Sequence, residues 1–211
     1  MRYERKYRIE DASLGEVRQV IQLHPASFCI AFPDRYINSI YFDNFAFAAL
    51  QENLAGISKR AKFRLRWYGK SLEKVENPQL EIKIKNNFTN RKETKALPSF
   101  LLRPGFDPSA YLQKHAKVKD RLVPVSIVRY FRSYFISQDG QVRATIDREL
   151  CYYLYQGKML LQHSPVHDPA IILEVKYEAE HDDQVDAIFQ SIPFRLTKNS
   201  KYASSINAHY L

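Results

Sequence analysis

Cationic and apolar residues alternate along residues 59–69, "KRAKFRLRWYG". One set of alternate positions holds cations: Lys62, Arg64 and Arg66. The other set is apolar: Phe63, Leu65 and Trp67. Because successive side chains of a β-strand point to opposite faces of its sheet, this stretch predicts a strand with one cationic and one apolar face.

The same pattern recurs along the chain. Residues 2–9, 79–86, 122–135, 141–150 and 170–180 all read as strands with charges on alternate positions, and residues 36–43 form a further strand with Ser39, Tyr41 and Asp43 on one face. The charged positions are Arg2, Glu4, Lys6, Arg8, Lys62, Arg64, Arg66, Glu81, Lys83, Arg132, Arg143, Asp147, Glu174 and Lys176. Tyr130 and Tyr134 share the face of Arg132.

Short helices are expected between these strands. Ser13 and Glu16 have the spacing of a capping box that opens a helix through about Leu23, and a loop with Pro25 and Pro33 follows. Further N-caps are predicted at Asn44, at Asp107 before Pro108, at Asp182 or Asp183, and at Thr197 for a last helix over residues 198–208. Residues 137–141, "SQDGQ", predict a hairpin turn. With no linker or repeat in between, residues 1–211 are expected to form one α+β domain.

A single amphipathic strand is explained by a sheet face that contacts water. Six strands with charged faces favour another arrangement, because like charges repel each other across an open sheet. Helices packed outside would cover the apolar faces, and closing the sheet would turn the charged faces inward. The pattern therefore predicts a closed antiparallel β-barrel with a charged lumen.

The composition narrows the choice of ligand. Lys and Arg number 32 against 23 Asp and Glu, giving a net charge of +9 and a pI near 9.4, which is typical of proteins that bind polyanions. The charged N-terminus and the absence of an apolar run of about 20 residues indicate a cytoplasmic protein without a membrane segment. Cys29 and Cys151 are expected to be reduced fillers of the core.

A lumen lined with cations requires anions. Arg suits bidentate contacts with phosphate and Lys supplies a point charge, so several phosphates in a row match this face better than one carboxylate. The carboxylates of the lumen are either ion-pair partners or ligands for a divalent cation that bridges phosphate oxygens. We favour the metal for Glu174, and both readings stay open for Glu4, Glu81 and Asp147.

In order, "RYERKYRI", "SIYFD", "KRAKFRLRWYG", "LEIKIK", "VRYFRSYF", "VRATIDREL", "ILEVKY" and "KNSKYA" resemble the VTC domain, the polyphosphate polymerase branch of the triphosphate tunnel metalloenzymes, which have a CYTH-like fold. The resemblance spans nearly the whole chain. It implies a tunnel of about eight strands and transfer of the γ-phosphate of ATP to inorganic polyphosphate, assisted by Mn²⁺ or Mg²⁺.

The resemblance also implies roles for individual residues. Phosphate-binding residues of the tunnel correspond to Lys6, Arg64, Arg66, Lys83, Tyr130, Arg132 and Arg143, and the phosphate-contacting C-terminal motif corresponds to Lys198, Ser200 and Lys201. Glu174 corresponds to the metal-binding glutamate. We expect Glu4 and Asp147 to assist the metal, and Arg2, Lys62 and Lys176 to add contacts to the phosphates. Lys198 and Lys201 are expected to share one face at the start of a helix.

The first strand departs from the related triphosphatases and cyclases. Those enzymes begin with a Glu, Glu, Lys pattern, whereas the matching positions here are Arg2, Glu4 and Lys6. The loss of one acid favours the polymerase branch over hydrolysis with two metals. A tripolyphosphatase or nucleoside triphosphatase on the same fold and a binding module without catalytic activity are the alternatives.

Other features receive structural interpretations. A nucleic-acid partner is not expected, because a duplex could not enter a closed barrel. Arg91, Lys92 and Lys95 are interpreted as an ordinary solvated basic face. His163 and His167 are interpreted as a surface pair in a loop rather than as metal ligands.

Overall fold

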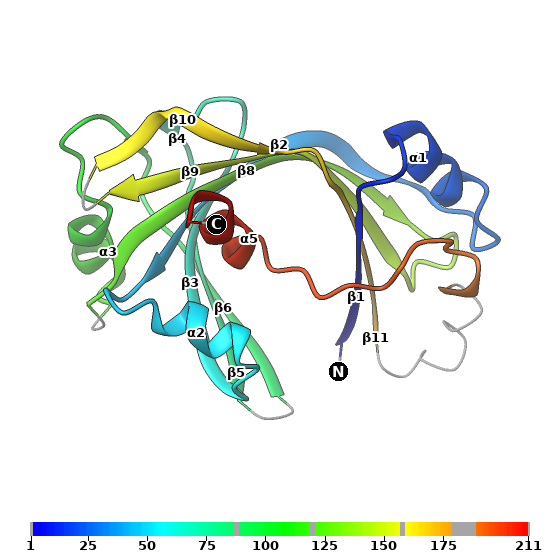
Figure 1. Ribbon diagram of the computed structural model, residues 1–211, viewed down its shortest axis with the longest axis horizontal. Coiled ribbons are helices and arrows are strands. Elements are labelled where there is room, and N and C mark those ends of the chain that lie inside the picture. Colours follow the sequence, from blue (N-terminus) through cyan, green and yellow to red (C-terminus); the bar gives the residue numbers. More distant parts are fainter. Residues whose placement is uncertain (1, 87–88, 119–120, 157–158, 179–188, 211) are drawn as a thin grey trace. The chain divides into compact units, whose positions relative to one another are not determined.

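A large antiparallel sheet dominates the computed structural model, which describes residues 2–86, 89–118, 121–156, 159–178 and 189–210 (Figure 1). Nine strands form this sheet in the order β1-β11-β9-β8-β2-β3-β5-β6, with β10 paired to β9, and β4 pairs with β7 in a second sheet. The strands are β1 Arg2–Ile9, β2 Cys29–Asp43, β3 Lys59–Tyr68, β4 Lys74–Val75, β5 Gln79–Asn86, β6 Thr89–Ala96, β7 Phe100–Leu101, β8 Val123–Ile136, β9 Arg143–Gln156, β10 Met159–Asp168 and β11 Ile171–Glu178. The helices are α1 Leu14–Gln22, α2 Ala48–Leu54, α3 Pro108–Ala116 and α5 Lys201–Tyr210. The α+β class is confirmed.

The prediction of a closed barrel is wrong. The order of paired strands over the described residues begins at β1 and ends at β6, so the ladder is open. The outer edge of β1 has another partner: Leu196 bridges Tyr7, the Thr197 amide donates to the Lys6 carbonyl (2.8 Å), and the Arg8 amide donates to the Thr197 hydroxyl (2.9 Å). This segment satisfies the edge groups that a closing strand would have used.

Two compact units can be distinguished in the chain. Unit 1 comprises residues 1–35, 130–150 and 168–199, and unit 2 comprises residues 36–129, 151–167 and 200–211. Long strands such as β2, β8 and β9 contribute residues to both units. Each unit has a hydrophobic core and a charged cluster of its own.

The core of unit 1 lies under α1. Val17 and Ile21 of this helix are fully buried against apolar residues of β1, β9 and β11, which include Ile9, Ile146 and Leu173. The predicted capping box is present, because the Ser13 hydroxyl accepts from the Glu16 amide (3.3 Å) and Glu16 accepts from the Ser13 amide (2.7 Å). The helix is therefore fixed at the residues that the sequence indicated.

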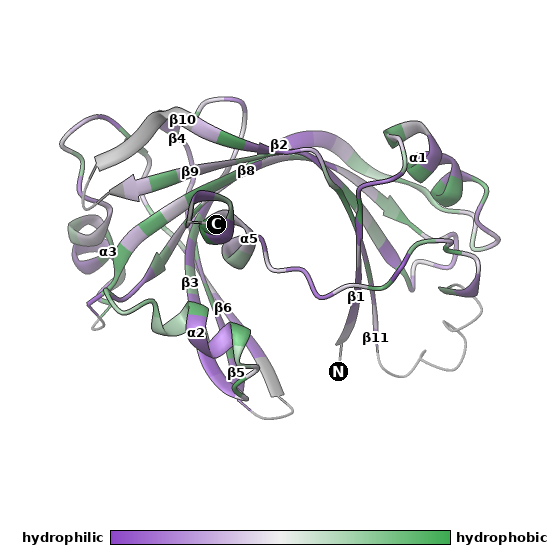
Figure 2. Cartoon of the chain, viewed as in Figure 1, coloured by the Kyte–Doolittle hydropathy of each residue, from purple (hydrophilic) through white to green (hydrophobic). Residues whose placement is uncertain are grey.

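The core of unit 2 confirms the alternation seen in residues 59–69. Leu65 and Trp67 are fully buried, and Phe63 packs at the edge of the same cluster, together with Leu80 of β5 and with Tyr111 and Leu112 of α3. The alternation of hydrophilic and hydrophobic residues along the strands can be followed in Figure 2. The predicted Asp107 cap of α3 is confirmed, since its carboxylate accepts from the Ser109 and Ala110 amides.

The prediction that helices cover only the apolar faces of the strands is wrong for α5. The α5 helix packs against residues on the polar face of unit 2: the Tyr202 ring stacks on Tyr41, and Ser205 and Ser126 are joined by a hydrogen bond of 2.8 Å. The α2 helix contacts both β3 and α5 (Figure 1). The helix α5 can pack on this part of the polar face because the strands present Tyr41 and Ser126 there instead of charged side chains.

Two predicted helix starts were wrong. The helix expected directly after Asn44 begins only at Ala48, because the Asn44 side chain first closes a turn by accepting from the Ala46 and Ala48 amides (both 3.0 Å). Thr197 does not cap α5, because it bonds to β1 and the helix begins at Lys201. Lys198 therefore lies outside α5, and the shared helical face expected for Lys198 and Lys201 does not exist. The helix expected at Asp182 or Asp183 lies outside the described residues.

Two predicted loops are strands in part or in full, although Pro25 does lie in a turn. Pro33 lies within β2. The pairing of β2 with β3 starts only at Ile37, which is opposite Tyr68, so this ladder does not need an amide from Pro33. His163 and His167 lie within β10 rather than in a loop. β6 was not expected at all.

No described helix is long and apolar enough to span a membrane.

Candidate phosphate-binding site

The charged residues of unit 2 meet around one buried carboxylate. Glu81 of β5 lies directly opposite Arg64 of β3 and is 4% exposed. Arg64 donates to Glu81 Oε2 at 2.5 Å, Lys92 Nζ lies 2.7 Å from Glu81 Oε1, and Arg66 Nη1 lies 3.6 Å from the same oxygen. Three cations thus share one acid, and the cluster keeps a positive charge.

The pKa of Glu81 records this arrangement. Burial opposes its ionisation, but the charges of Arg66 and Arg64 and the hydrogen bond and charge of Lys92 outweigh burial and lower the pKa to about 2. The carboxylate is therefore ionised at neutral pH and works as an ion-pair partner. The sequence left two roles open for Glu81, ion-pair partner or metal ligand, and the structure shows it as an ion-pair partner.

Glu81 should make the stability of the protein depend on pH in the acid range. A folded-state pKa near 2 against an ordinary value of 4.5 means that Glu81 stabilises the fold above about pH 4.5 and loses this contribution as the pH falls toward 2. We expect the free energy of unfolding, measured with urea at pH 2 to 6, to fall by up to about 3 kcal/mol more in the wild type than in Glu81→Gln over this range. Parallel curves for the two proteins would contradict this assignment.

A row of lysines crosses three strands beside this cluster. Lys62 of β3 lies opposite Lys83 of β5, which lies opposite Lys92 of β6. Side chains that are opposite in an antiparallel ladder have Cβ atoms about 5 Å apart, and like charges in this position repel each other. A bound polyanion would remove this cost. Lys92 was missed because the sequence placed it on a solvated face.

Unit 1 holds a second cluster, in which acids and bases alternate. Arg132 of β8 forms a bidentate pair with the fully buried Asp147 of β9, with Nη2 2.7 Å from Oδ2, and the same Nη2 lies 3.8 Å from Glu174 of β11. Burial alone would lower the pKa of Arg132, but the charge and hydrogen bond of Asp147, with Tyr130 and Glu174, raise it well above its ordinary value. Arg132 is thus a permanent cation that Asp147 holds in place.

The chain of charges continues into β1. Lys176 pairs with Glu174 and lies 3.8 Å from Glu4, and Lys6 Nζ lies 2.6 Å from the other oxygen of Glu4. Glu4 therefore faces two lysines. Arg8 does not belong to this cluster, because its guanidinium forms a bidentate pair with Asp168 at 2.8 and 2.9 Å and a further bond to Glu10.

Glu174 and Thr145 offer oxygen donors of the kind that a hard divalent cation accepts, although Lys176 already pairs with the Glu174 carboxylate. Its carboxylate is 6% exposed, and Thr145 lies directly opposite it in the ladder between β11 and β9. The buried Thr145 hydroxyl oxygen has no hydrogen-bond partner among the described residues. Carboxylate and hydroxyl oxygens are donors that Mg²⁺ and Mn²⁺ accept. In the described part of the chain, no three His, Cys, Asp or Glu side chains converge on one point, so such an ion would rely on other ligands as well.

The remaining predicted residues differ in their surroundings. In unit 1, Tyr130 is buried with its ring 5.2 Å from the Arg132 guanidinium, Arg143 is exposed opposite Lys176, and Lys198 is exposed before α5. In unit 2, Ser200 Oγ lies 3.4 Å from Lys62 Nζ, and Lys201 is half-buried in the first turn of α5. The side chain of Arg2, opposite Glu178, lies outside the described side chains.

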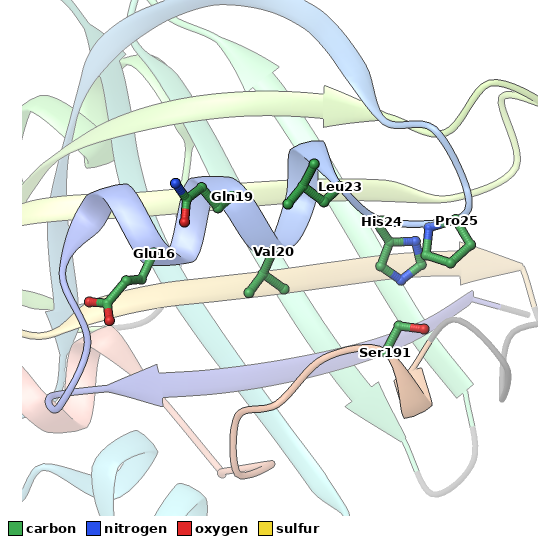
Figure 3. Close-up of a pocket in the computed structure, with 7 residues that line it drawn as sticks. All are labelled: Glu16, Gln19, Val20, Leu23, His24, Pro25 and Ser191. Carbon is green, nitrogen blue, oxygen red and sulfur yellow. The ribbon is translucent and has the colours of Figure 1, made fainter.

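A hollow beside α1 does not suit a polyanion. It has a volume of about 340 Å³, and Figure 3 shows the residues that line it: Glu16, Gln19, Val20, Leu23, His24, Pro25 and Ser191. Among these lining residues, Glu16 supplies a negative charge and none is a Lys or Arg. The two charged clusters are therefore the better candidates for phosphate binding.

Comparison with known proteins agrees with this fold. Three solved structures share it: a candidate adenylate cyclase from Vibrio parahaemolyticus (12% identity, TM-score 0.56, 98% of this chain and 97% of that one), a candidate adenylyl cyclase from Hippeastrum described as having a dominant triphosphatase activity (14%, 0.52, 98% and 96%), and a protein from Pyrococcus horikoshii (10%, 0.53, 99% and 98%). At these identities the likeness concerns the fold alone. The family model of the VTC domain matches residues 1–102 and 105–210, and the chain therefore belongs to the VTC domain family.

Proposed function

We propose that this protein transfers the γ-phosphate of ATP to the end of an inorganic polyphosphate chain, with Mg²⁺ or Mn²⁺ as cofactor. One observation carries the proposal: in unit 2, Arg64, Arg66 and Lys92 converge on a single ionised carboxylate, Glu81. Beside it, Lys62, Lys83 and Lys92 are opposite one another on three neighbouring strands. Membership of the VTC family and a fold shared with a protein described as a triphosphatase support an enzyme that acts on triphosphates.

The cations of unit 2 are proposed to bind phosphate oxygens. Arg64 and Arg66 offer planar donors that match phosphate bidentately, while Lys62 and Lys83 act as point charges. Glu81 orients both guanidinium groups before a ligand arrives. Because this order is present in advance, less conformational entropy is lost on binding.

In unit 1, Arg132 and Lys6 are proposed to bind phosphates, with Arg2, Arg143 and Lys176 as further cations. Tyr130 holds Arg132 through its ring. Glu174 would hold the cation, with Glu4 nearby and with Asp147 acting through Arg132. Once bound, a divalent ion supplies charge neutralisation at phosphate oxygens. Lys198, Ser200 and Lys201 are proposed to contact the phosphates as well.

Phosphoryl transfer does not require a protein nucleophile. The terminal oxygen of polyphosphate attacks the γ-phosphorus of ATP, the bond to the β-phosphate oxygen breaks, and ADP leaves. Catalysis then consists of alignment and of charge stabilisation by Arg and Lys side chains. No acid or base beyond these cations is needed, because the attacking oxygen is already ionised.

The acid content of β1 favours the polymerase over a hydrolase. Glu4 is the only acid among the alternate positions Arg2, Glu4 and Lys6, and two lysines already contact it. Two-metal hydrolysis would need more carboxylate at this strand. A triphosphatase remains the second candidate because of the activity described for the Hippeastrum protein. Cys151 is a buried free thiol, as predicted, whereas Cys29 is an exposed free thiol rather than a core filler. Two free thiols are consistent with the reducing, cytoplasmic location that we propose.

Product analysis from ATP tests the proposal. With ATP, Mn²⁺ and a polyphosphate primer, we expect ADP and a ladder of longer polyphosphate on a gel. Orthophosphate released from tripolyphosphate without chain growth would identify a triphosphatase. Tight polyphosphate binding without any turnover would identify a binding module, and both outcomes would overturn the polymerase.

A further inference from the structure

Asp43, at the end of β2, joins three elements of unit 2. Its carboxylate is 2% exposed and accepts from the Asn44 amide (2.8 Å) and from the Ala49 and Leu50 amides of α2 (both 3.0 Å). The Tyr202 hydroxyl of α5 donates to the same carboxylate at 2.6 Å. One buried charge therefore ties the start of α2 to the first turn of α5, and it is fully provided with donors.

The ring of Tyr202 makes a second connection. It stacks on the Tyr41 ring at 5.4 Å with an interplanar angle of 14°. The Tyr41 hydroxyl in turn accepts from Arg64 Nη1 at 3.3 Å. Burial and the bond to Asp43 raise the pKa of Tyr202, so its hydroxyl stays a donor at any ordinary pH. Through one aromatic pair, α5 is thus connected to the guanidinium that is bound to Glu81.

The residues just before Tyr202 belong to the proposed phosphate site. Ser200 Oγ lies 3.4 Å from Lys62 Nζ, and Lys62 also donates to Asn53 of α2 at 2.7 Å. Lys201 precedes Tyr202 directly in the chain. Tyr202 lies in the same first turn as Lys201 and two positions after Ser200, so anchoring Tyr202 restricts the backbone that carries both residues.

We propose that Asp43 and Tyr202 form a positioning pair, which holds Ser200 and Lys201 in register with Arg64 for binding a run of phosphates. The inference rests on the proposed function of this site. Neither residue contacts substrate in this proposal: the pair acts through Lys201 and Ser200. A phosphate chain then meets cations of β3 and α5 that are already ordered, and the affinity gain comes from this order rather than from new contacts.

A double-mutant cycle distinguishes positioning from mere stabilisation. The dissociation constant of tripolyphosphate is measured by calorimetry, without metal and well below the unfolding temperature, for the wild type, Tyr202→Phe, Lys201→Ala and the double variant. We expect Tyr202→Phe to weaken binding about 3- to 10-fold and to have almost no further effect when Lys201 is already Ala, because coupled residues are not additive. Tyr155→Phe is the matched control, since the buried Tyr155 hydroxyl has no partner in the described part of the chain. It should leave the affinity unchanged.

The outcomes separate this inference from the proposed function. If Lys201→Ala leaves tripolyphosphate binding intact, the proposed phosphate role of Lys201 fails, and the positioning pair fails with it. If Lys201→Ala weakens binding but Tyr202→Phe does not, or if the two effects add, only the positioning pair is overturned. Asp43→Asn gives an independent check if Tyr202→Phe folds poorly: an amide oxygen in the Oδ2 position accepts from Tyr202 and from the Leu50 amide, whereas Ala offers no acceptor, so Asp43→Asn should bind more tightly than Asp43→Ala. Equal affinity of these two variants would contradict the proposal.

Discussion

Replacing Glu174 with Gln should abolish turnover while leaving polyanion binding nearly intact. The amide keeps the size of the side chain and can still accept from Lys176 and Arg132, but it removes the charge that a divalent cation requires. We expect polyphosphate synthesis from ATP to fall by about 10²-fold or more. Tripolyphosphate affinity measured without metal should change less than about threefold, because the loss of an acid does not weaken an anion site.

Metal binding and a surface control sharpen this experiment. Titration with Mn²⁺, followed by electron paramagnetic resonance, should show a site in the wild type that Glu174→Gln loses. Glu10→Gln is the matched control, because this exposed carboxylate also pairs with an arginine, Arg8, outside the cluster. Unchanged turnover and unchanged Mn²⁺ binding in Glu174→Gln would remove Glu174 from the metal site.

Most of the strands that carry the two clusters were predictable from alternation alone. β1, β3, β5 and β11 begin or end within a residue or two of the expected positions, since each buries one face and charges the other. β6 gave no such signal. Its sequence, "TNRKETKA", is polar on both faces, as an edge strand can be, so no hydrophobic period marks it. The role of Lys92 at Glu81 was hidden for the same reason.

Long-range contacts explain what local patterns missed. Asp43 and Tyr202 are 159 positions apart, and nothing near either residue in the sequence indicates the other. Thr197 has the right residue type for an N-cap, but its hydroxyl and amide bond to β1 instead. That contact also replaces the strand that the barrel prediction required at this edge. Alternation of polar and apolar residues predicts which face of a strand carries its charges. It does not predict what lies at the edge of the sheet, because that depends on segments far away in the chain, such as Leu196 and Thr197 at β1.

Replacing Arg64 and Arg66 together with Gln should weaken polyphosphate binding and reduce its dependence on salt. Each contact between a cation and a phosphate contributes about 0.7 to 0.9 to the magnitude of the slope of log K against log salt, so this magnitude should fall by about 1.5 if two contacts are lost. This applies a rule from nucleic acids to another polyanion. We expect tripolyphosphate affinity to fall about 10²- to 10³-fold at low salt, because these guanidinium groups make charge-assisted bonds. Lys95→Gln with Lys117→Gln, two exposed cations outside the cluster, removes the same charge and is the control.

Glu81 allows the loss of binding to be separated from a loss of stability. Without Arg64 and Arg66, this buried carboxylate keeps only the Lys92 contact among those that lower its pKa, so the double variant should unfold more easily. Adding Glu81→Gln should restore much of the free energy of unfolding, because the unpaired charge is gone, but it should not restore tripolyphosphate binding. If the triple variant regained affinity along with stability, the arginines would act by supporting the fold. Persistent weak binding in a stable triple variant would instead place Arg64 and Arg66 in direct contact with phosphate.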